Sequence, residues 1–249
     1  MVSGFFSWKT GPDTGVCDKS GETREEVREI KKKDEKTEDG FLYRNFREED
    51  LPILAELIRK VWGYEEMLSQ KNALELSMVD ILTALSRADY IDIVEKAGRP
   101  VGFLIGSFRL YRENDSVGDR FQSRLKEEKD RLRHSHGGRI LLIVSPLLNR
   151  INRKLIRKSH TPYFAELSYL VLDASCRKKG IGRKLCERFE NCLATEGING
   201  FFVKTDTMSN YHFYDRMGFR RAASKTIGIP FVKKLQISFF LYEKSLPHL

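Results

Sequence analysis

The apolar and polar residues of this chain follow two different periods, which predicts a mixture of helices and strands. Between Leu51 and Trp62 the apolar residues recur every three or four positions, so a helix that begins near Asp50 buries one face. Residues 90–95 and 101–108 are two extended apolar runs separated by Gly98, which predicts a hairpin. The expected strands are 41–46, 90–95, 101–108, 165–172, 200–207, 220–228 and 236–244. After the helix that begins near Asp50, further helices are expected at 73–87, 119–133, 146–158, 182–196 and 210–217. This order predicts an α/β sheet covered by helices.

The composition along the chain predicts where the folded domain begins and which kinds of segment and site it lacks. Residues 1–40 are polar and mix both charge signs, which predicts a disordered or loosely helical leader before a domain at 41–249. The start lacks the apolar stretch of a signal peptide, and no run approaches the roughly 18 apolar residues of a membrane span. The four cysteines match no metal-binding spacing. We therefore expect a cytoplasmic protein with no membrane span and no metal site.

Residues 176–185, "CRKKGIGRKL", place two glycines and several cations between a strand and a helix. A helix N-terminus presents unpaired N–H groups and therefore attracts anions. Gly180 and Gly182 allow a sharp turn and a close approach of a bound group. The cations of this loop, Arg177, Lys178, Lys179 and Arg183, would then lie beside a pyrophosphate. The alternative is a structural turn whose basic side chains face solvent.

Two rival nucleotide motifs are excluded at this loop. The dinucleotide fingerprint G-x-G-x-x-G needs a third glycine where the chain has Leu185. The triphosphate-binding pattern G-x-x-x-x-G-K-[ST] is absent from the chain as well.

Two motifs in sequence resemble the GNAT (Gcn5-related) N-acetyltransferases. "ELSYLVLDASCRKKGIGRKL" resembles motif A, in which an apolar strand leads into R/Q-x-x-G-x-G/A. "SNYHFYDRMGFRR" resembles motif B, an Asn followed by F-Y-x-x-x-G-F. The resemblance covers roughly residues 41–249 apart from an insertion at 110–163. It implies a mixed, mostly antiparallel sheet that is splayed between its fourth strand (165–172) and its fifth (200–207), flanked by helices.

The resemblance also implies the co-substrate and the residues that bind it. The donor would be acetyl-coenzyme A or another acyl-CoA, and the acceptor would be an amine that attacks directly in a ternary complex: a small molecule, a lysine side chain or a protein N-terminus. The pantetheine arm would pair with the edge of the fourth strand, and the pyrophosphate would lie on the amides of residues 178–183. The implied cofactor-binding residues are Leu170, Val171, Leu172, Arg177, Lys178, Lys179, Gly180, Ile181, Gly182, Arg183, Lys184 and Asn210.

Three residues are candidates for the chemistry that the resemblance implies. The backbone N–H of Leu170 would polarise the thioester carbonyl, and Tyr214 would protonate the leaving thiolate. Glu166 lies 11 residues before Arg177, where lysine-directed members of the family carry a base. Two of these side chains have a structural alternative: Glu166 could face solvent through strand alternation, and Tyr214 could be an aromatic core residue. Asn210 could bind the coenzyme or cap a helix.

The insertion departs from the family and carries most of the positive charge. Between Arg109 and Lys158 there are 14 Lys and Arg against 6 Asp and Glu, a surplus of 8 in a chain whose net charge is +9. Residues 146–158 predict an amphipathic helix with a basic face. Three interpretations stay open: a helical subdomain packed on the sheet, a wall of the acceptor site that selects an acidic or anionic substrate, or a surface for nucleic acid or anionic lipid. The chain as a whole could also be an acyl-CoA-binding module with weak or no catalysis whose insertion binds a partner.

Overall fold

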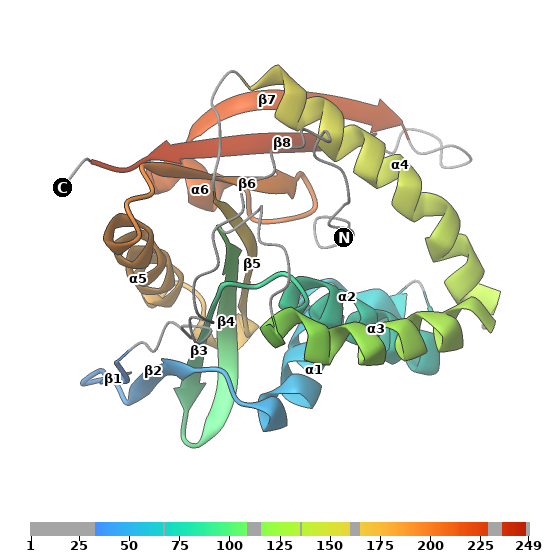
Figure 1. The fold of residues 1–249 in the computed structure, drawn as a ribbon, viewed down its shortest axis with the longest axis horizontal. Helices are drawn as coiled ribbons and strands as arrows, with labels where there is room; N and C mark the ends of the chain where they lie inside the picture. Colours follow the sequence, from blue (N-terminus) through green and yellow to red (C-terminus); the bar gives the residue numbers. More distant parts are fainter. Residues whose placement is uncertain are drawn as a thin grey trace, which may run out of the picture.

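The computed structural model describes residues 33–66, 68–108, 116–134, 136–159, 165–228 and 236–247. Their strands form one sheet in the order β1-β2-β3-β4-β5-β6-β8-β7 (Figure 1). The strands are β1 (Glu35–Lys36), β2 (Phe41–Asn45), β3 (Tyr90–Lys96), β4 (Arg99–Ser107), β5 (Glu166–Leu172), β6 (Gly200–Asp206), β7 (Arg220–Gly228) and β8 (Gln236–Ser245). Neighbouring strands are antiparallel except β5 and β6, which run parallel. The expected mixed, mostly antiparallel sheet is confirmed.

The sheet opens between β5 and β6. Their register pairs Glu166 with Phe202 and Leu167 with Val203, and beyond these residues the described parts of the two strands no longer pair. On the other side of β5 the ladder with β4 continues to Leu172, with a register shift that leaves Ser168 unpaired as a bulge. The splay between the fourth and fifth expected strands is therefore present, and the bulge lies where it begins.

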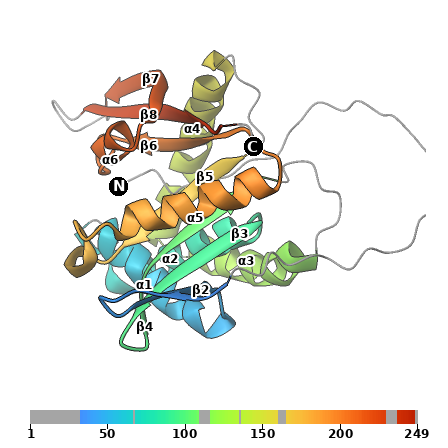
Figure 2. The same cartoon turned by 90° about the vertical axis from the view of Figure 1, so that its left-hand side faces the viewer.

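Helices cover both faces of this sheet. They are α1 (Leu51–Val61), α2 (Gln70–Leu85), α3 (Ser116–His134), α4 (His136–Lys158), α5 (Ile181–Thr195) and α6 (His212–Arg216), with short 3₁₀ turns η1 (Glu48–Asp50), η2 (Tyr64–Glu66) and η3 (Ala174–Cys176). Buried side chains of α1 to α4 share one core with Tyr169 and Val171 of β5. Those of α5 and α6 share a second core with Leu167. Figure 1 shows α5 on one side of β4 and β5 and α1, α2 and α3 on the other, and Figure 2 views the molecule from the α5 side.

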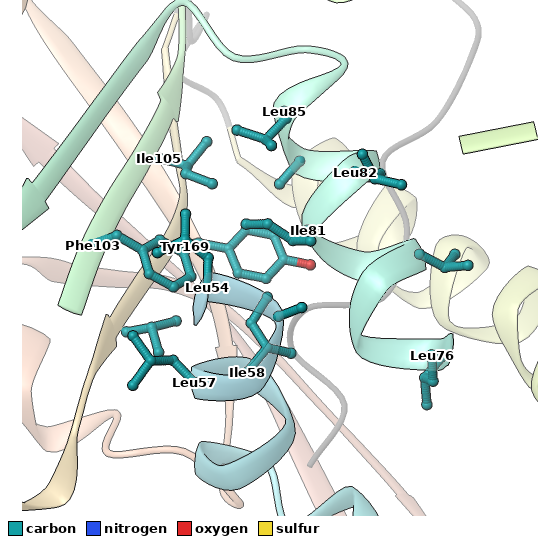
Figure 3. Close-up of a cluster of buried hydrophobic side chains, with 14 of the residues drawn as sticks. Leu54, Leu57, Ile58, Leu76, Ile81, Leu82, Leu85, Phe103, Ile105 and Tyr169 are labelled. Atoms are coloured by element: carbon teal, nitrogen blue, oxygen red, sulfur yellow. The ribbon is translucent and has the colours of Figure 1, made fainter. Parts of the chain in front are cut away.

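The first core shows how amphipathic helices hold β5 in place. Leu54 and Ile58 of α1 are fully buried, at 0% exposure, on the apolar stripe that the sequence predicts. Ile81 and Leu82 of α2 are also at 0% exposure, because α2 packs against both α1 and α3 and its last two turns are buried on all sides. Figure 3 shows Leu54, Ile58 and Ile81 beside the ring of Tyr169, with Leu82 on the other side of α2. The α1–α2 face of β5 is therefore well packed up to the splay.

The insertion forms two helices that span one side of the molecule. α3 packs against α2, and α4 runs from the end of α3 to β7 and β8 (Figure 1). The helical insertion between the third and fourth expected strands is confirmed, but α4 begins at His136 rather than near Pro146. Helix propensity hid this start, since Gly137, Gly138 and an interior proline all disfavour a helix in isolation.

Two further expectations differ from the structure at the edges. Glu35 and Lys36, inside the expected leader, form β1 and pair with Tyr43 and Leu42 of β2. The rest of the expected leader, residues 1–32, and residues 109–115 and 160–164 of the insertion lie outside the described residues. Among the helices that the structure describes, none has the length and apolar character needed to cross a membrane.

Candidate functional site

The bulge at Ser168 gives β5 two chemically distinct faces. Leu170 and Leu172 are half-buried and pack toward α5 and α6. Tyr169 and Val171 are buried against α1 and α2. Because the described part of β6 has separated from β5 here, residues 168–172 keep their ladder with β4 but do not pair with β6 on the other side. An extended amide-containing arm could pair with that edge as an additional strand would.

The glycine loop lies at the C-terminal end of the same strand. Gly180 has φ +76° and Lys178 has φ +61°, so the chain makes two left-handed turns before α5 begins at Ile181. The amide of Lys184 donates to the Gly180 carbonyl at 3.0 Å, which is an ordinary bond of the helix. The N–H groups that precede it in the first turn have no acceptor within the helix. This combination of αL turns and a helix N-terminus is the arrangement that binds phosphates.

Gly182 connects the loop to the splay. A Cβ at this position would lie 3.4 Å from Leu172 Cδ1 and 3.5 Å from the ring of Phe213. The start of α5, the end of β5 and α6 therefore converge at Gly182. The structure thus brings together the expected strand residues Leu170, Val171 and Leu172, the loop and the motif B helix.

The basic residues of the loop divide into two groups. Arg177, Lys178, Lys179 and Arg183 are exposed and are available to an anion in solution. Lys184 is expected at the phosphates, but its Nζ lies 2.9 Å from Glu35 of β1, which also binds Arg188 at 3.0 Å. These hydrogen bonds, with that of Lys184 the largest effect, lower the pKa of Glu35. The sequence could not reveal this pair because its partners are far apart along the chain.

Tyr214 lies on the α5–α6 face, the same face as Leu170. Its side chain is 9% exposed, and its ring packs at 5.4 Å from Phe219 and 5.8 Å from Tyr242. Burial, with a smaller contribution from the nearby Cys186 thiol, raises the pKa of Tyr214. The phenol therefore carries its proton at neutral pH, as a proton donor must.

Asn210 lies in the turn before α6 and is exposed. The N-cap of α6 is Tyr211, so the side chain of Asn210 does not cap this helix. Its carbonyl accepts the amide of Phe213 at 3.0 Å, and its carboxamide forms no hydrogen bond with the described residues. The carboxamide is therefore free to bind a ligand.

Glu166 is the first residue of β5 and faces the α1–α2 side, opposite to Leu167. Its Oε1 lies 2.8 Å from Nζ of Lys204 on β6, and the two side chains are 16% and 11% exposed. The alternative that Glu166 simply faces solvent is therefore wrong. The ion pair engages Oε1, so a proton from an amine would be accepted by the second carboxylate oxygen or after Lys204 moves away. Sequence reasoning missed Lys204, although a lysine inside the apolar run "GFFVKTDT" was a usable signal.

A buried polar cluster lies behind Tyr169 on the same side. The hydroxyl of Tyr64 donates to the carboxyl of Asp80 on α2, and both residues are 2% exposed. Burial raises the pKa of Asp80 well above its ordinary value, although the Tyr64 hydrogen bond opposes this effect. The rings of Trp62 and Tyr169 meet edge to face at 5.3 Å. This cluster shapes the wall beside β5 and was also missed from the sequence.

The comparisons with known proteins agree with this geometry. Residues 151–221 match a family model described as an acetyltransferase (GNAT) domain. An uncharacterized N-acetyltransferase of Chlorobaculum tepidum is 41% identical over 61 residues. These residues are 24% of this chain and 37% of the relative, so the match spans little more than a third of the relative's length. The crystal structure of a protein named SsHAT superposes with a TM-score of 0.57 at 18% identity and covers 83% of this chain and 98% of its own. The PaiA N-acetyltransferase of Thermoplasma acidophilum, solved with coenzyme A, superposes with a TM-score of 0.47 at 15% identity over 82% and 98% of the two chains.

Proposed function

We propose that this chain is a GNAT acetyltransferase that transfers an acetyl group from acetyl-coenzyme A to a primary amine, a proposal supported by the matching family model and the N-acetyltransferase relative. One observation carries this proposal most directly. The edge of β5 that β6 leaves at the splay leads directly into a loop with two αL residues and the N–H groups of a helix N-terminus. An amide-containing arm that ends in a diphosphate needs these two features in this order.

The donor would be bound mainly by backbone groups. Residues 170–172 would pair with the pantetheine amides, and the amides of residues 178–183 would bind the diphosphate. Arg177, Lys178, Lys179 and Arg183 would add charge, and Asn210 would donate from the turn before α6. Lys184 would contribute after releasing Glu35.

The two faces of β5 divide the chemistry between them. The neutral amine would enter from the α1–α2 face and form a bond to the thioester carbon, while the N–H of Leu170 would stabilise the carbonyl oxygen. Glu166 would accept the proton that the nitrogen loses as this bond forms. The carbon–sulfur bond would break, and the thiolate would take the proton of Tyr214 on the opposite face.

A second candidate function is an acyl-CoA-binding module with weak or no catalysis. The observation in its favour is the ion pair between Glu166 and Lys204, which occupies the expected base. A partner bound by the basic insertion would then be the functional output.

The test is to measure acetyl-CoA binding by calorimetry and thiol release with a panel of amines. We expect micromolar binding, and for Tyr214→Phe a fall in kcat of about 10²- to 10⁴-fold with little change in binding. Tyr211→Phe is the matched control, because it removes a phenol from the same turn and should keep full activity. Binding without turnover of any amine would favour the module, and absence of binding would refute both functions.

A further inference from the structure

α6 carries the candidate proton donor but is too short to fix its own orientation. The helix has five residues, His212–Arg216, and a helix of this length is not stable in water without tertiary contacts. The ring of Tyr214 packs at 5.4 Å from Phe219 and at 5.8 Å from Tyr242. These ring contacts bury the phenol, but hydrogen bonds constrain orientation more tightly because they weaken steeply with angle. The next residue of α6 makes such a bond.

Asp215 connects α6 to β8. Its Oδ1 accepts the hydroxyl proton of Tyr242 at 2.8 Å. This hydrogen bond is the largest of the effects that lower the pKa of Asp215, so the carboxylate is ionised at neutral pH and the bond is charge-assisted. Tyr242 is at 0% exposure and belongs to the same core as Tyr214. Its hydroxyl is therefore a fixed point to which the residue after Tyr214 is attached.

Arg221 of β7 holds the Tyr242 hydroxyl in this orientation. Nε of Arg221 donates to the hydroxyl oxygen at 2.9 Å, so the hydroxyl directs its own proton to Asp215. Nη2 of Arg221 also lies 3.6 Å from Oδ2 of Asp215. The guanidinium lies over two rings of β8, 4.3 Å from the centroid of Phe240 and 5.2 Å from that of Tyr242. A chain of hydrogen bonds thus runs from β7, at the edge of the described sheet, through β8 to α6.

This chain of hydrogen bonds matters more for the direction of Tyr214 than for the stability of the fold. The side chain of Asp215 is 40% exposed, so water can replace the Tyr242 hydroxyl when that bond is lost. A general acid, by contrast, works only within hydrogen-bond reach of the atom that it protonates. A misplacement of about 1 Å can cost about 10²-fold in rate. Loss of the bond should therefore impair proton donation before it impairs folding.

We propose that Tyr242 and Arg221 are positioning residues that act through Asp215 and hold Tyr214 toward the leaving thiolate. This inference rests on the proposed acetyl transfer, in which Tyr214 donates the proton. In this role neither positioning residue acts on a reacting atom. They determine the direction of the phenol because they fix the short helix that carries it. Tyr242 lies outside the motif that contains Tyr214, so the sequence pattern does not identify it.

The first test is Tyr242→Phe, which keeps the ring and removes the hydroxyl. With the best amine of the panel, kcat should fall ~10- to 100-fold while the KM for acetyl-CoA stays unchanged. Tyr90→Phe is the matched control and should keep full kcat. Tyr90 is 2% exposed in the same core and donates to Asp92 at 3.1 Å, but it lies on β3, which β4 and β5 separate from β6. Asp215→Asn retains a carbonyl acceptor and should keep most of kcat, whereas Asp215→Ala should lose as much as Tyr242→Phe.

The second test repeats Tyr242→Phe in the Tyr214→Phe protein. Because the proton donor is then absent, the added change should lower kcat by roughly twofold at most. A merely structural role of Tyr242 would give the same loss in both backgrounds. Equal losses in both, or an unchanged kcat for Tyr242→Phe alone, would overturn the positioning role.

A third measurement does not depend on turnover. The backbone amides of residues 212–217 should exchange hydrogen faster in Tyr242→Phe than in the wild type, and at the wild-type rate in Tyr90→Phe. Unchanged exchange in Tyr242→Phe would contradict the inference even if no amine is acetylated. Two other outcomes concern the proposed function instead. A full kcat for Tyr214→Phe would remove the proposed proton donor and this inference with it, and absence of acetyl-CoA binding would refute the acetyl transfer itself.

Discussion

Asp80→Asn should stabilise this protein at neutral pH, and by more as the pH rises. Asp80 is 2% exposed and its pKa is raised mainly by burial, so the native carboxyl keeps its proton at a pH where the unfolded carboxyl, with a pKa of about 3.9, has lost it. Unfolding then releases a proton, and above pH ~4 each pH unit costs about 1.4 kcal/mol of stability until the native pKa is reached. Asparagine removes this cost and still offers Tyr64 a carbonyl acceptor.

The assay is urea unfolding of both proteins between pH 5 and pH 8. We expect the stability difference in favour of Asp80→Asn to grow over this range and to reach about 1–3 kcal/mol at pH 7. Asp50→Asn is a matched comparison with the opposite sign, because Asp50 is also 2% exposed but binds Arg44 at 2.8 Å. Removing its charge should cost about 3–5 kcal/mol. A pH-independent difference for Asp80→Asn, or a loss of stability that grows toward pH 8, would refute the reasoning.

Three further predictions concern the donor side. Gly182→Ala should fold normally, because its Cβ finds ordinary contacts at 3.4 and 3.5 Å, but should weaken acetyl-CoA binding ~10-fold by narrowing the space between Leu172 and Phe213. Gly180→Ala should instead lower the free energy of unfolding by about 1 kcal/mol, because Gly180 has φ +76° although no neighbour lies within 4 Å of an added Cβ. If Gly182→Ala lost stability and Gly180→Ala lost acetyl-CoA affinity, this assignment would be contradicted. Glu35→Gln should tighten acetyl-CoA binding a few-fold at low salt by releasing Lys184, and an unchanged affinity would show that Lys184 does not reach the donor.

The hydrophobic pattern predicted the elements of the fold well, because most of them bury one face. The strand at 220–228 matches β7, and the expected helix at 182–196 differs from α5 by one residue at each end. The opening of the sheet beside β5 came from the resemblance of two motifs and not from periodicity. A pattern of buried residues cannot show that β5 and β6 stop pairing after Leu167 and Val203, because burial of side chains does not report which backbone edges are paired.

Partners that are distant in sequence could not be predicted at all. Glu166 is a recognisable candidate base, but its ion pair with Lys204 depends on the parallel register of two strands. Lys184 has a recognisable place in the glycine loop, yet Glu35 lies 149 residues before it and belongs to a segment whose composition predicts disorder. In both cases the residue type indicated a charge, and the fold alone decided which opposite charge it met.

The positions of Tyr214 and Glu166 on opposite faces of the sheet explain why the insertion matters for function. Leu170 and Tyr214 face α5 and α6, while Glu166 and Tyr169 face α1 and α2. An amine and a thioester can therefore approach the splay from different sides without competing for one entrance. α3 and α4 lie on the α1–α2 side of the sheet. α3 packs against α2, and α4 packs against β7 and β8. If the proposed acetyl transfer is correct, the donor would bind between β5, the glycine loop and α5, and none of these belongs to α3 or α4. Changes in the two helices of the insertion should therefore alter the acceptor side and leave acetyl-CoA binding unchanged.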